Sequence, residues 1–407
     1  MKKKYILRKK IFAVIFFIML FSFSGVNCIS QRKEVQKALT EELSKVHAWQ
    51  IPETSNIEDE ITEELAGKMY FIETYSALTE VLNKKEICNY RYIKDETGTL
   101  QYSSFYREDD DNIPEYAMRV RRMADAVKAQ DTKVLMVSAP AKYLEGKTPL
   151  RKGLPANDTT AAVNELLYYM NLYGIKTLDL REYFPNDELT LSQTFFRSDH
   201  HWTIPAAYYA TRILVEKLFS EFGENLDPTG YYTGRISYTP KTFKNIMLGS
   251  TGRNTGAFYV GVENFTALFP NFIGDFRRSS MAADGTEYYT KGNFADALMN
   301  IEEVAAEDNI YHVSPYTMYL NELRTYESIT NKEKPDAPSI LFLRDSYFSP
   351  VIVFMAPMCS QIDAIYIMEE TDKIDIEDFI VKNHFDYIIV EVNPYNIGEE
   401  SFNFFYD

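Results

Sequence analysis

Two of the five histidines in the chain are adjacent, in the segment Asp199-His200-His201-Trp202. Asp199 and His201 are two residues apart beside a turn, so the carboxylate can bond one imidazole nitrogen and leave the other free. A serine hydroxyl needs this relation between an orienting acid and a histidine base to become a nucleophile. The alternative is that Asp199 caps the helix that follows and the histidines are ordinary loop residues.

Ser346 is the candidate nucleophile, in the segment Arg344-Asp345-Ser346-Tyr347 directly after a predicted strand. A serine just past the carboxyl end of a parallel strand exposes its hydroxyl at the edge of the sheet and leaves its own N–H free for an oxyanion. With Asp199 and His201 it completes a set suited to acyl transfer. The alternative for Ser346 is a helix N-cap, a common place for serine and on position alone the favoured one.

The elements that must position these residues follow one another as strands and helices in turn. This order favours an α/β fold, a doubly wound parallel sheet with helices on both faces. The helix after the histidine pair has Thr203 as a cap and Pro205 in its first turn. Residues 227–300 are rich in Gly, Thr, Asn, Tyr and Phe and predict an insertion of loops and hairpins. Strands are predicted at 133–138, 177–180, 339–343, 364–367 and 387–392, and helices at 123–129, 161–173, 204–222 and 376–383.

The N-terminus has the features of a targeting segment. The first ten residues carry six positive charges and no acid, and residues 11–26 are mostly apolar. An uncleaved signal-anchor is favoured over a cleaved signal peptide, with the basic end in the cytoplasm and the remaining chain outside. We therefore divide the chain into a signal-anchor or signal peptide at 1–28, a helical stalk or cap at 29–89, and an α/β domain at 90–407.

Composition excludes several classes of protein. The chain has 407 residues, 45% hydrophobic and 25% charged, as expected for a globular protein. Without the six N-terminal cations, the remaining basic residues against 59 acidic ones give a net charge of about −22, which argues against a nucleic-acid partner. Of three cysteines, only Cys88 and Cys359 could pair within the domain, so a disulfide scaffold is excluded.

The two short motifs together resemble a known type of domain. An Asp-x-His-Trp segment upstream and Asp-Ser after a strand downstream are similar to the SGNH-hydrolase-like domains of alginate O-acetyltransferases, and the Asp-His-His-Trp form resembles the DHHW proteins. The likeness covers most of residues 85–400 and includes residues 137–142, 248–253, 319–320 and 326–331.

This resemblance implies Ser346 as the acyl-accepting nucleophile, His201 as the base and Asp199 as the residue that orients it. His200 then fills the variable position of the motif. It further implies an extracytoplasmic O-acetyltransferase, or an acetylesterase, that acts on a cell-surface polysaccharide without a metal or cofactor. A multi-spanning membrane acyltransferase is the expected partner, because the serine needs an acyl donor delivered across the membrane.

Weaker predictions concern contacts to the substrate. We expect them at His200, Lys142, Arg344 and Tyr347, and at Trp202, for which packing is the favoured role because tryptophan is usually well buried. Arg344 departs from the glycine or lysine that is usual before Asp-Ser.

Two further departures are the pair Phe348-Ser349, in place of Ala-Asn, and residues 368–370, which lack an expected arginine and tyrosine. They put the substrate contacts in question. The second oxyanion donor is open between Asn393, Asn331 and the backbone near Lys142.

Two other functions compete with acyl transfer. Asp-His-His is also the motif of manganese phosphoesterases, but Asp179 lacks an Asp-x-Asp partner and no third suitable histidine occurs. A carbohydrate-binding or scaffold protein with a degenerate site is the second alternative, and the complete set of Asp199, His201 and Ser346 argues against it.

Overall fold

The computed structural model describes residues 2–30 and most of the chain from residue 67 onward. The chain divides into two compact units, residues 1–78 and 79–407. About half of the stalk or cap predicted at 29–89 lies outside the described residues. Its described part includes helix α4 (Lys68–Val81) and strand β1 (Glu86–Ile87). The described residues are 2–30, 32–33, 36–37, 40, 65, 67–106, 110, 112–306, 309–312, 314–320, 323–368 and 374–406.

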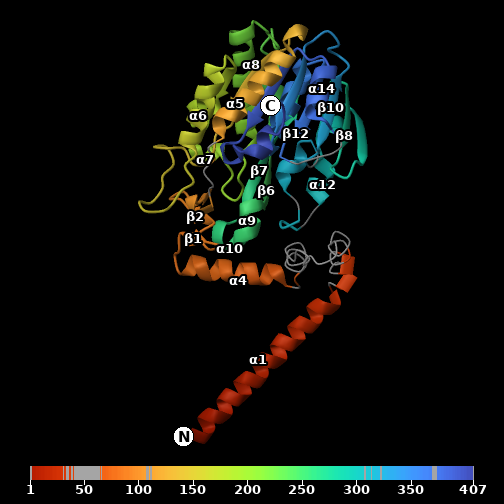
Figure 1. Cartoon of the computed structure of the whole chain (residues 1–407). Coiled ribbons are helices and arrows are strands. Elements are labelled where there is room, and N and C mark those ends of the chain that lie inside the picture. The colour runs from red at the N-terminus through yellow and green to blue at the C-terminus, as the bar shows by residue number, and fades with distance from the viewer. Residues whose placement is uncertain are drawn as a thin grey trace. The chain divides into compact units, whose positions relative to one another are not determined.

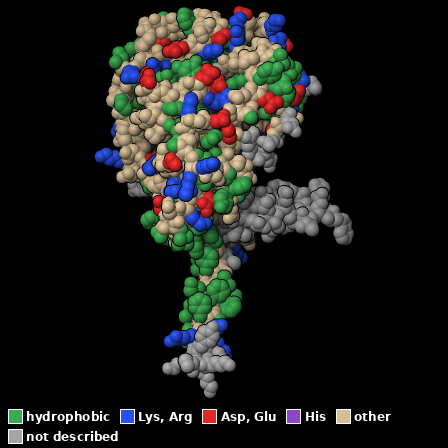
Figure 2. Space-filling model, turned by 90° about the vertical axis from the view of Figure 1, so that its left-hand side faces the viewer, with side chains coloured by type: hydrophobic (Ala, Val, Ile, Leu, Met, Phe, Trp, Pro, Cys, Tyr) green, Lys and Arg blue, Asp and Glu red, His purple; other side chains and the backbone are tan. Residues whose placement is uncertain are grey.

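The N-terminal helix α1 (Lys2–Ser30) is long and apolar enough to cross a membrane. Its segment Arg8–Asn27 has a mean hydropathy of 1.9, and a signal sequence near an N-terminus would meet the same criteria. Figure 2 shows apolar side chains along this helix and basic side chains near its amino-terminal end. This arrangement fits the predicted targeting segment, as an anchor or as a signal.

The second unit is built on an eight-stranded sheet in the order β5-β4-β13-β11-β12-β10-β8-β9. The first five strands run parallel, as predicted, and each coincides with a predicted strand to within a few residues. They are β5 (Lys176–Asp179), β4 (Lys133–Ser138), β13 (Tyr387–Val392), β11 (Ser339–Arg344) and β12 (Gln361–Tyr366).

Three antiparallel strands extend this sheet, and the sequence did not predict them: β10 (Tyr326–Asn331), β8 (Phe276–Met281) and β9 (Glu287–Gly292). Buried residues alternate with less buried ones along β8 and β10, and β9 has no buried residue. Such strands lack the continuous apolar run that marks a strand buried on both faces. Part of the predicted insertion therefore belongs to the main sheet.

Helices cover both faces of the parallel strands, as predicted (Figure 1). Successive side chains of a strand point to opposite faces. Leu135 and Val137 of β4 thus pack in one core with helices α8 (Ile204–Phe222) and α13 (Ser349–Met355). Val134 and Met136 pack in the other core, with helices α5 (Ile113–Ala126), α6 (Thr160–Leu172) and α14 (Ile376–Lys382).

The rest of the insertion forms a two-stranded antiparallel sheet of β6 (Tyr238–Met247) and β7 (Glu263–Pro270). Two short helices, α9 (Ser250–Thr255) and α10 (Ala257–Val260), connect the two strands. A separate three-stranded sheet contains β1, β2 (Tyr92–Lys94) and β3 (Leu100–Tyr102). Cys88 and Cys359 are both free thiols.

Candidate active site

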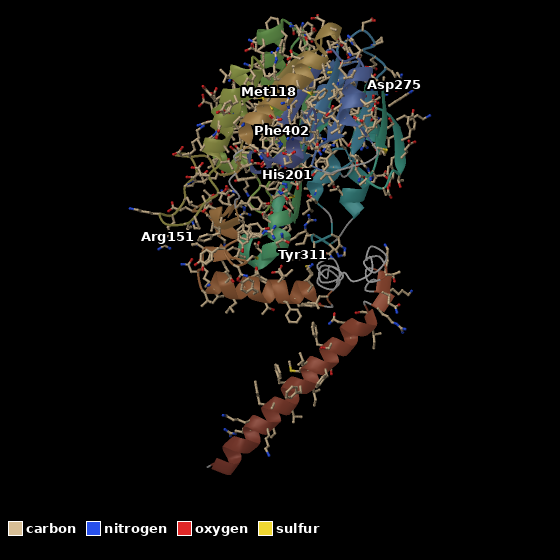
Figure 3. The ribbon with its side chains drawn as sticks, in the orientation of Figure 1. Met118, Arg151, His201, Asp275, Tyr311 and Phe402 are labelled. Atoms are coloured by element: carbon tan, nitrogen blue, oxygen red, sulfur yellow. The ribbon has the colours of Figure 1, made fainter. Side chains whose placement is uncertain are left out.

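The structure brings Asp199, His201 and Ser346 together at the carboxyl edge of the parallel strands. The Nε2 atom of His201 lies 2.8 Å from the Ser346 hydroxyl, and its Nδ1 atom lies 2.5 Å from the Asp199 carboxylate. Figure 3 marks His201 at the lower end of the sheet. With the Nδ1 proton held by the carboxylate, Nε2 is free to accept the serine proton. Asp199 is buried, whereas Ser346 is partly exposed.

Neither Asp199 nor Ser346 serves as a helix cap, so both capping alternatives are wrong. The hydroxyl of Thr203 caps α8 by accepting a hydrogen bond from the N–H of Ala206. Asp345 caps the short 3-10 helix at Ser346–Phe348 and accepts a hydrogen bond from the N–H of Tyr347 at 2.9 Å. Because Thr203 and Asp345 cap these helices, the Asp199 carboxylate and the Ser346 hydroxyl are both available to hydrogen-bond His201.

The Asp199 carboxylate is held by groups on both of its oxygens. Oδ1 accepts from the His201 backbone N–H at 3.0 Å, and Oδ2 accepts from the Ser250 N–H at 2.6 Å. Burial alone would raise the pKa of Asp199, but the two adjacent histidines and the hydrogen bonds from His201 hold it well below its usual value. A Cβ at Gly249 would lie 2.2 Å from Oδ2, so only glycine lets the chain pass this carboxylate.

Two ionic groups hold the loop that carries Asp199, the partly buried Glu263 and the buried Lys142. The Glu263 carboxylate, on β7, accepts hydrogen bonds from the N–H groups of Arg197 at 2.9 Å and Ser198 at 2.7 Å, and from the Ser198 hydroxyl. The Lys142 ammonium donates to the carbonyls of Asp199 at 2.6 Å and Arg197 at 3.2 Å. Burial lowers the pKa of Lys142 to about 8. Both groups position the loop by bonding its backbone.

Sequence reasoning missed Glu263 and Tyr316 and gave no role to Gly249 and Ser250. Gly249 and Ser250 lie in the segment 248–253, which belongs to the resemblance, and this segment is the sequence feature that indicates them. Glu263 and Tyr316 lie in no motif, so only the fold identifies them.

The His201 ring lies between aromatic neighbours. It stacks on Tyr316, with ring centroids 4.0 Å apart and planes 17° apart, and the Tyr316 hydroxyl donates to the carbonyl of Tyr347 at 2.8 Å. The Trp202 Nε1–H donates to the same carbonyl at 3.0 Å, and the Tyr347 hydroxyl donates to the carbonyl of His200. These bonds tie the histidine loop to the segment that carries Ser346.

His200 lies beside His201, with ring centroids 3.8 Å apart, and its Nδ1 is 2.9 Å from the Ser250 hydroxyl. Its side chain is 28% exposed. Removal from water, together with the adjacent His201, lowers the pKa of His200 to about 3. A neutral His200 can therefore hydrogen-bond to a ligand but carries no charge at neutral pH.

Arg344 is completely buried, at 0% exposure. Its Nη2 lies 3.5 Å from the Glu327 carboxylate, which also binds the Nε of Arg278 at 2.7 Å. Its Nη1 donates to the Ser349 hydroxyl at 3.3 Å. Buried charges require such partners, and the arginine that departs from the family pattern is therefore part of an ionic group within the sheet.

Four of the five predicted substrate contacts lie in the interior and cannot touch a polymer as placed. Their exposure is 2% for Lys142, 0% for Trp202, 0% for Arg344 and 1% for Tyr347. We correct the predictions for Lys142, Arg344 and Tyr347 to positioning roles, because each of these side chains is held by backbone carbonyls or by other buried groups. The burial of Trp202 agrees with packing, the role that was favoured for it. His200 stays a predicted contact.

The described residues contain one cluster of three potential metal ligands, Asp199, His200 and His201. Its Asp199 and His201 atoms already bond each other at 2.5 Å. Asp179, the residue considered for a phosphoesterase, instead pairs with Arg181 at 2.7 Å. The donor set is thus a poor fit to the manganese alternative.

Asn331 and Asn393, two candidates for the second oxyanion donor, lie at opposite ends of the sheet's strands. Asn331 ends β10 and bonds Ser360, which precedes β12, so it lies at the opposite end of the strands from Ser346, and this guess is wrong. Asn393 follows β13, and its N–H donates to the Asp345 carboxylate at 2.8 Å. Its side-chain Nδ2 is buried and has no hydrogen-bond partner among the described residues.

Comparison with known proteins confirms the type of domain that the motifs predicted. Residues 100–248 match the family model described as the SGNH hydrolase-like domain of acetyltransferase AlgX. This match contains Asp199, His200 and His201 and ends before Ser346. No curated protein is significantly similar to the chain.

Solved structures support the same fold. PatB1 from Bacillus cereus superposes with a TM-score of 0.61 at 16% identity, covering 77% of this chain and 99% of PatB1. A second structure of PatB1, with a sulfonyl adduct, gives a TM-score of 0.58 at 15% identity over 77% of this chain and 97% of that chain. A DHHW family protein from Eubacterium siraeum gives 0.56 at 15% identity, covering 78% and 95%.

Proposed function

We propose that this chain is an extracytoplasmic serine acyltransferase of the SGNH-hydrolase-like type, which transfers acetyl groups to a polysaccharide. The observation that carries the proposal is the single chain of contacts from the Asp199 carboxylate through His201 to the Ser346 hydroxyl. The matched family model, described as a domain of an acetyltransferase, supports the choice of an acyl group.

In the proposed reaction, His201 Nε2 takes the proton from Ser346 as its oxygen attacks the carbonyl carbon of the acyl donor. The tetrahedral intermediate places its oxyanion against the Ser346 N–H, with the unpaired Asn393 amide as our candidate for the second donor. Collapse releases the donor's leaving group, which takes the proton from His201. A sugar hydroxyl then attacks the acyl carbon of the acyl-serine while His201 takes its proton. The bond to Ser346 Oγ breaks, the proton returns from His201 to Ser346, and the sugar ester leaves.

Helix α1 supports a place at the membrane. As an uncleaved anchor it would hold the second unit beside an integral membrane partner that supplies the acyl donor, and as a signal it would be removed and the protein secreted. In both cases the site lies outside the cytoplasm. Water in place of the sugar hydroxyl gives an esterase by the same steps, so exclusion of water decides between the two activities.

The direct test is covalent labelling of Ser346. Full-length protein in detergent is treated with p-nitrophenyl acetate or a sulfonyl fluoride, since PatB1 has been solved with a sulfonyl adduct, and the adduct is located by peptide mass analysis. We expect one adduct on Ser346 and a rate at least about a thousandfold lower for Ser346→Ala. Ser220→Ala, an exposed serine of α8, is the matched control.

The two histidines separate acyl transfer from the alternative of a scaffold protein. His201→Ala should reduce labelling about as much as Ser346→Ala, because the serine loses its base, whereas His200→Gln should reduce it less than about tenfold. Equal labelling of the Ser346→Ala protein and the wild type would leave the non-catalytic carbohydrate-binding alternative. Transfer is then distinguished from hydrolysis by counting acetyl groups on an added oligosaccharide against free acetate.

A further inference from the structure

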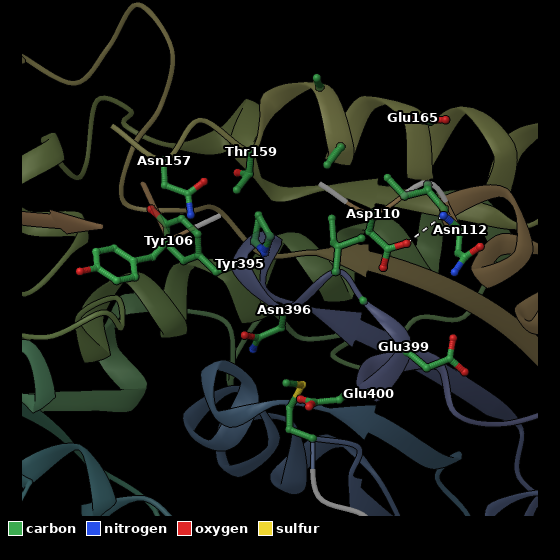
Figure 4. Close-up of a pocket in the computed structure, with 17 residues that line it drawn as sticks. Tyr106, Asp110, Asn112, Asn157, Thr159, Glu165, Tyr395, Asn396, Glu399 and Glu400 are labelled. Atoms are coloured by element: carbon green, nitrogen blue, oxygen red, sulfur yellow. Dashed lines mark hydrogen bonds between the residues drawn. The ribbon is translucent and has the colours of Figure 1, made fainter. Parts of the chain in front are cut away.

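A hollow of about 950 Å³ opens on the side of the sheet covered by α5 and α6. It lies between the amino-terminal ends of these helices and the segment after β13. Figure 4 shows the rings of Tyr106 and Tyr395 on one side of it and the carboxyl groups of Asp110 and Glu399 on the other. We call it the tyrosine-carboxylate pocket, defined by these four residues together with Asn396, Glu165 and Glu400.

The pocket adjoins the loop of the nucleophile. Asn396 lines it, and the Asn396 amide donates to the Asp345 carboxylate at 2.8 Å, one residue before Ser346. Asn393, three residues earlier, bonds the same carboxylate oxygen. The segment 393–396 thus lies between the pocket and the loop that carries Ser346, and it contacts both.

The charge of the pocket is of one sign. Among the described residues that line it there are four carboxylates and no lysine or arginine. Asp110 accepts hydrogen bonds from the Asn112 N–H and the Tyr116 hydroxyl, and Glu399 pairs with Arg119 at 2.7 Å. Glu165 and Glu400 are exposed and have no ion-pair partner among the described residues.

Aromatic faces accompany these carboxylates. Tyr106 is 58% exposed, and beside it in the sequence Phe105 is 66% exposed and packs edge-on to Tyr90. A cation is attracted both by carboxylates and by the face of an aromatic ring, whereas an anionic chain would be repelled and would meet no lysine or arginine among the described lining residues. The ring of Tyr106 and the carboxylates of Glu165 and Glu400 in one pocket are thus groups that bind protonated amines.

We propose that this pocket binds a glycan that carries protonated amino groups, and that it rejects polyuronates. The inference rests on the proposed function, since it names the class of acceptor for the acyl group on Ser346. Glu165 and Glu400 would contact the amino groups, and Tyr106 would lie against the sugar ring.

The test is equilibrium binding by calorimetry at pH 6 and low salt, with the full-length protein in detergent. Three probes of equal length are compared: a glucosamine oligomer, an N-acetylglucosamine oligomer and a uronate oligomer. We expect affinity in that order, and a weaker affinity for the glucosamine oligomer in 0.5 M salt, where charges are screened.

Single variants Glu165→Gln and Glu400→Gln should each lower the affinity for the glucosamine oligomer about two- to fivefold, and the double variant about tenfold, as for exposed ion pairs. Glu287→Gln on β9 is the matched control and should leave affinity unchanged. Uronate binding equal to glucosamine binding, or unchanged affinity in the double variant, overturns the inference.

Labelling of Ser346 by an activated ester is measured on the wild-type protein in the same series. Labelling with unselective oligomer binding means that the glycan inference fails while acyl transfer stands. Selective binding without any labelling means that acyl transfer fails, and the pocket stands as the site of a carbohydrate-binding protein.

Discussion

The imidazole of His201 lies nearly parallel to the ring of Tyr316, 4.0 Å from centroid to centroid. The catalytic arrangement proposed for His201 needs both of its ring nitrogens in fixed directions, one toward Asp199 and one toward Ser346. Hydrogen bonds fix two points of the ring, and the tyrosine face fixes its plane. Four predictions test how the surroundings of this ring support its chemistry.

Replacement of Tyr316 separates its ring from its hydroxyl. Tyr316→Leu should lower the rate of Ser346 acylation about fivefold, because an aromatic pair contributes about 1 kcal/mol and the imidazole loses its support. Tyr316→Phe keeps the ring, and Trp202 still donates to the Tyr347 carbonyl, so its rate should fall less than threefold. Rates are measured by p-nitrophenol release. Equal rates for the two variants would contradict the role of the ring.

A methyl group at Gly249 should displace the carboxylate that orients His201. Because the added carbon would lie 2.2 Å from Asp199 Oδ2, Gly249→Ala should reduce acylation about a hundredfold. Ser250→Ala keeps the backbone N–H that Asp199 accepts and should reduce it only a few-fold. Circular dichroism confirms that both variants fold. A Gly249→Ala protein of normal activity would sink this account of the glycine.

Glu263→Gln should weaken both stability and activity. The carboxylate accepts four hydrogen bonds from Arg197 and Ser198, and an amide cannot accept from all of them, so we expect a loss of about 2 kcal/mol in the free energy of unfolding. Chemical denaturation measures the loss, with Glu287→Gln as the exposed control. Equal free energies of unfolding for the Glu263→Gln and Glu287→Gln proteins would contradict a stabilising role of Glu263.

The low pKa of His200, about 3, predicts an acid-sensitive site. The unfolded chain binds a proton near pH 6.5 while the folded protein does not, so stability decreases as pH falls from about 6.5 toward 3. At pH 5 the loss relative to pH 7 should reach at most about 2 kcal/mol. Above pH 6.5 both states are neutral and His200 contributes no pH dependence.

Denaturation of wild type and His200→Gln at pH 7 and pH 5 measures this effect. The glutamine cannot take a proton, so the variant should lose less stability on acidification than the wild type. An identical loss in both proteins would show that His200 is not the group that titrates.

Short-range patterns in the sequence determined the parallel strands, helices α6, α8 and α14, and the three residues of the proposed triad. The helix predicted at 123–129 was wrong in its bounds, since α5 spans Ile113–Ala126, and α13 was not predicted. Continuous apolar runs mark strands buried on both faces, and Thr203 and Pro205 mark the start of α8. The pair Asp199 and His201 was readable because a two-residue spacing already constrains its geometry. For Ser346, its place after a strand together with the resemblance was sufficient.

Only the tertiary structure decided what surrounds these residues. Ser250, Glu263 and Tyr316 lie 49 to 115 residues from His201 in the sequence. The packing of the insertion brings Ser250 and Glu263 against the loop of His201, and the segment before β10 brings Tyr316 against its ring. Burial likewise decided that Lys142, Trp202, Arg344 and Tyr347 position the site instead of facing a substrate. A residue type does not reveal whether its side chain meets water or protein, because that depends on chain segments far away in the sequence.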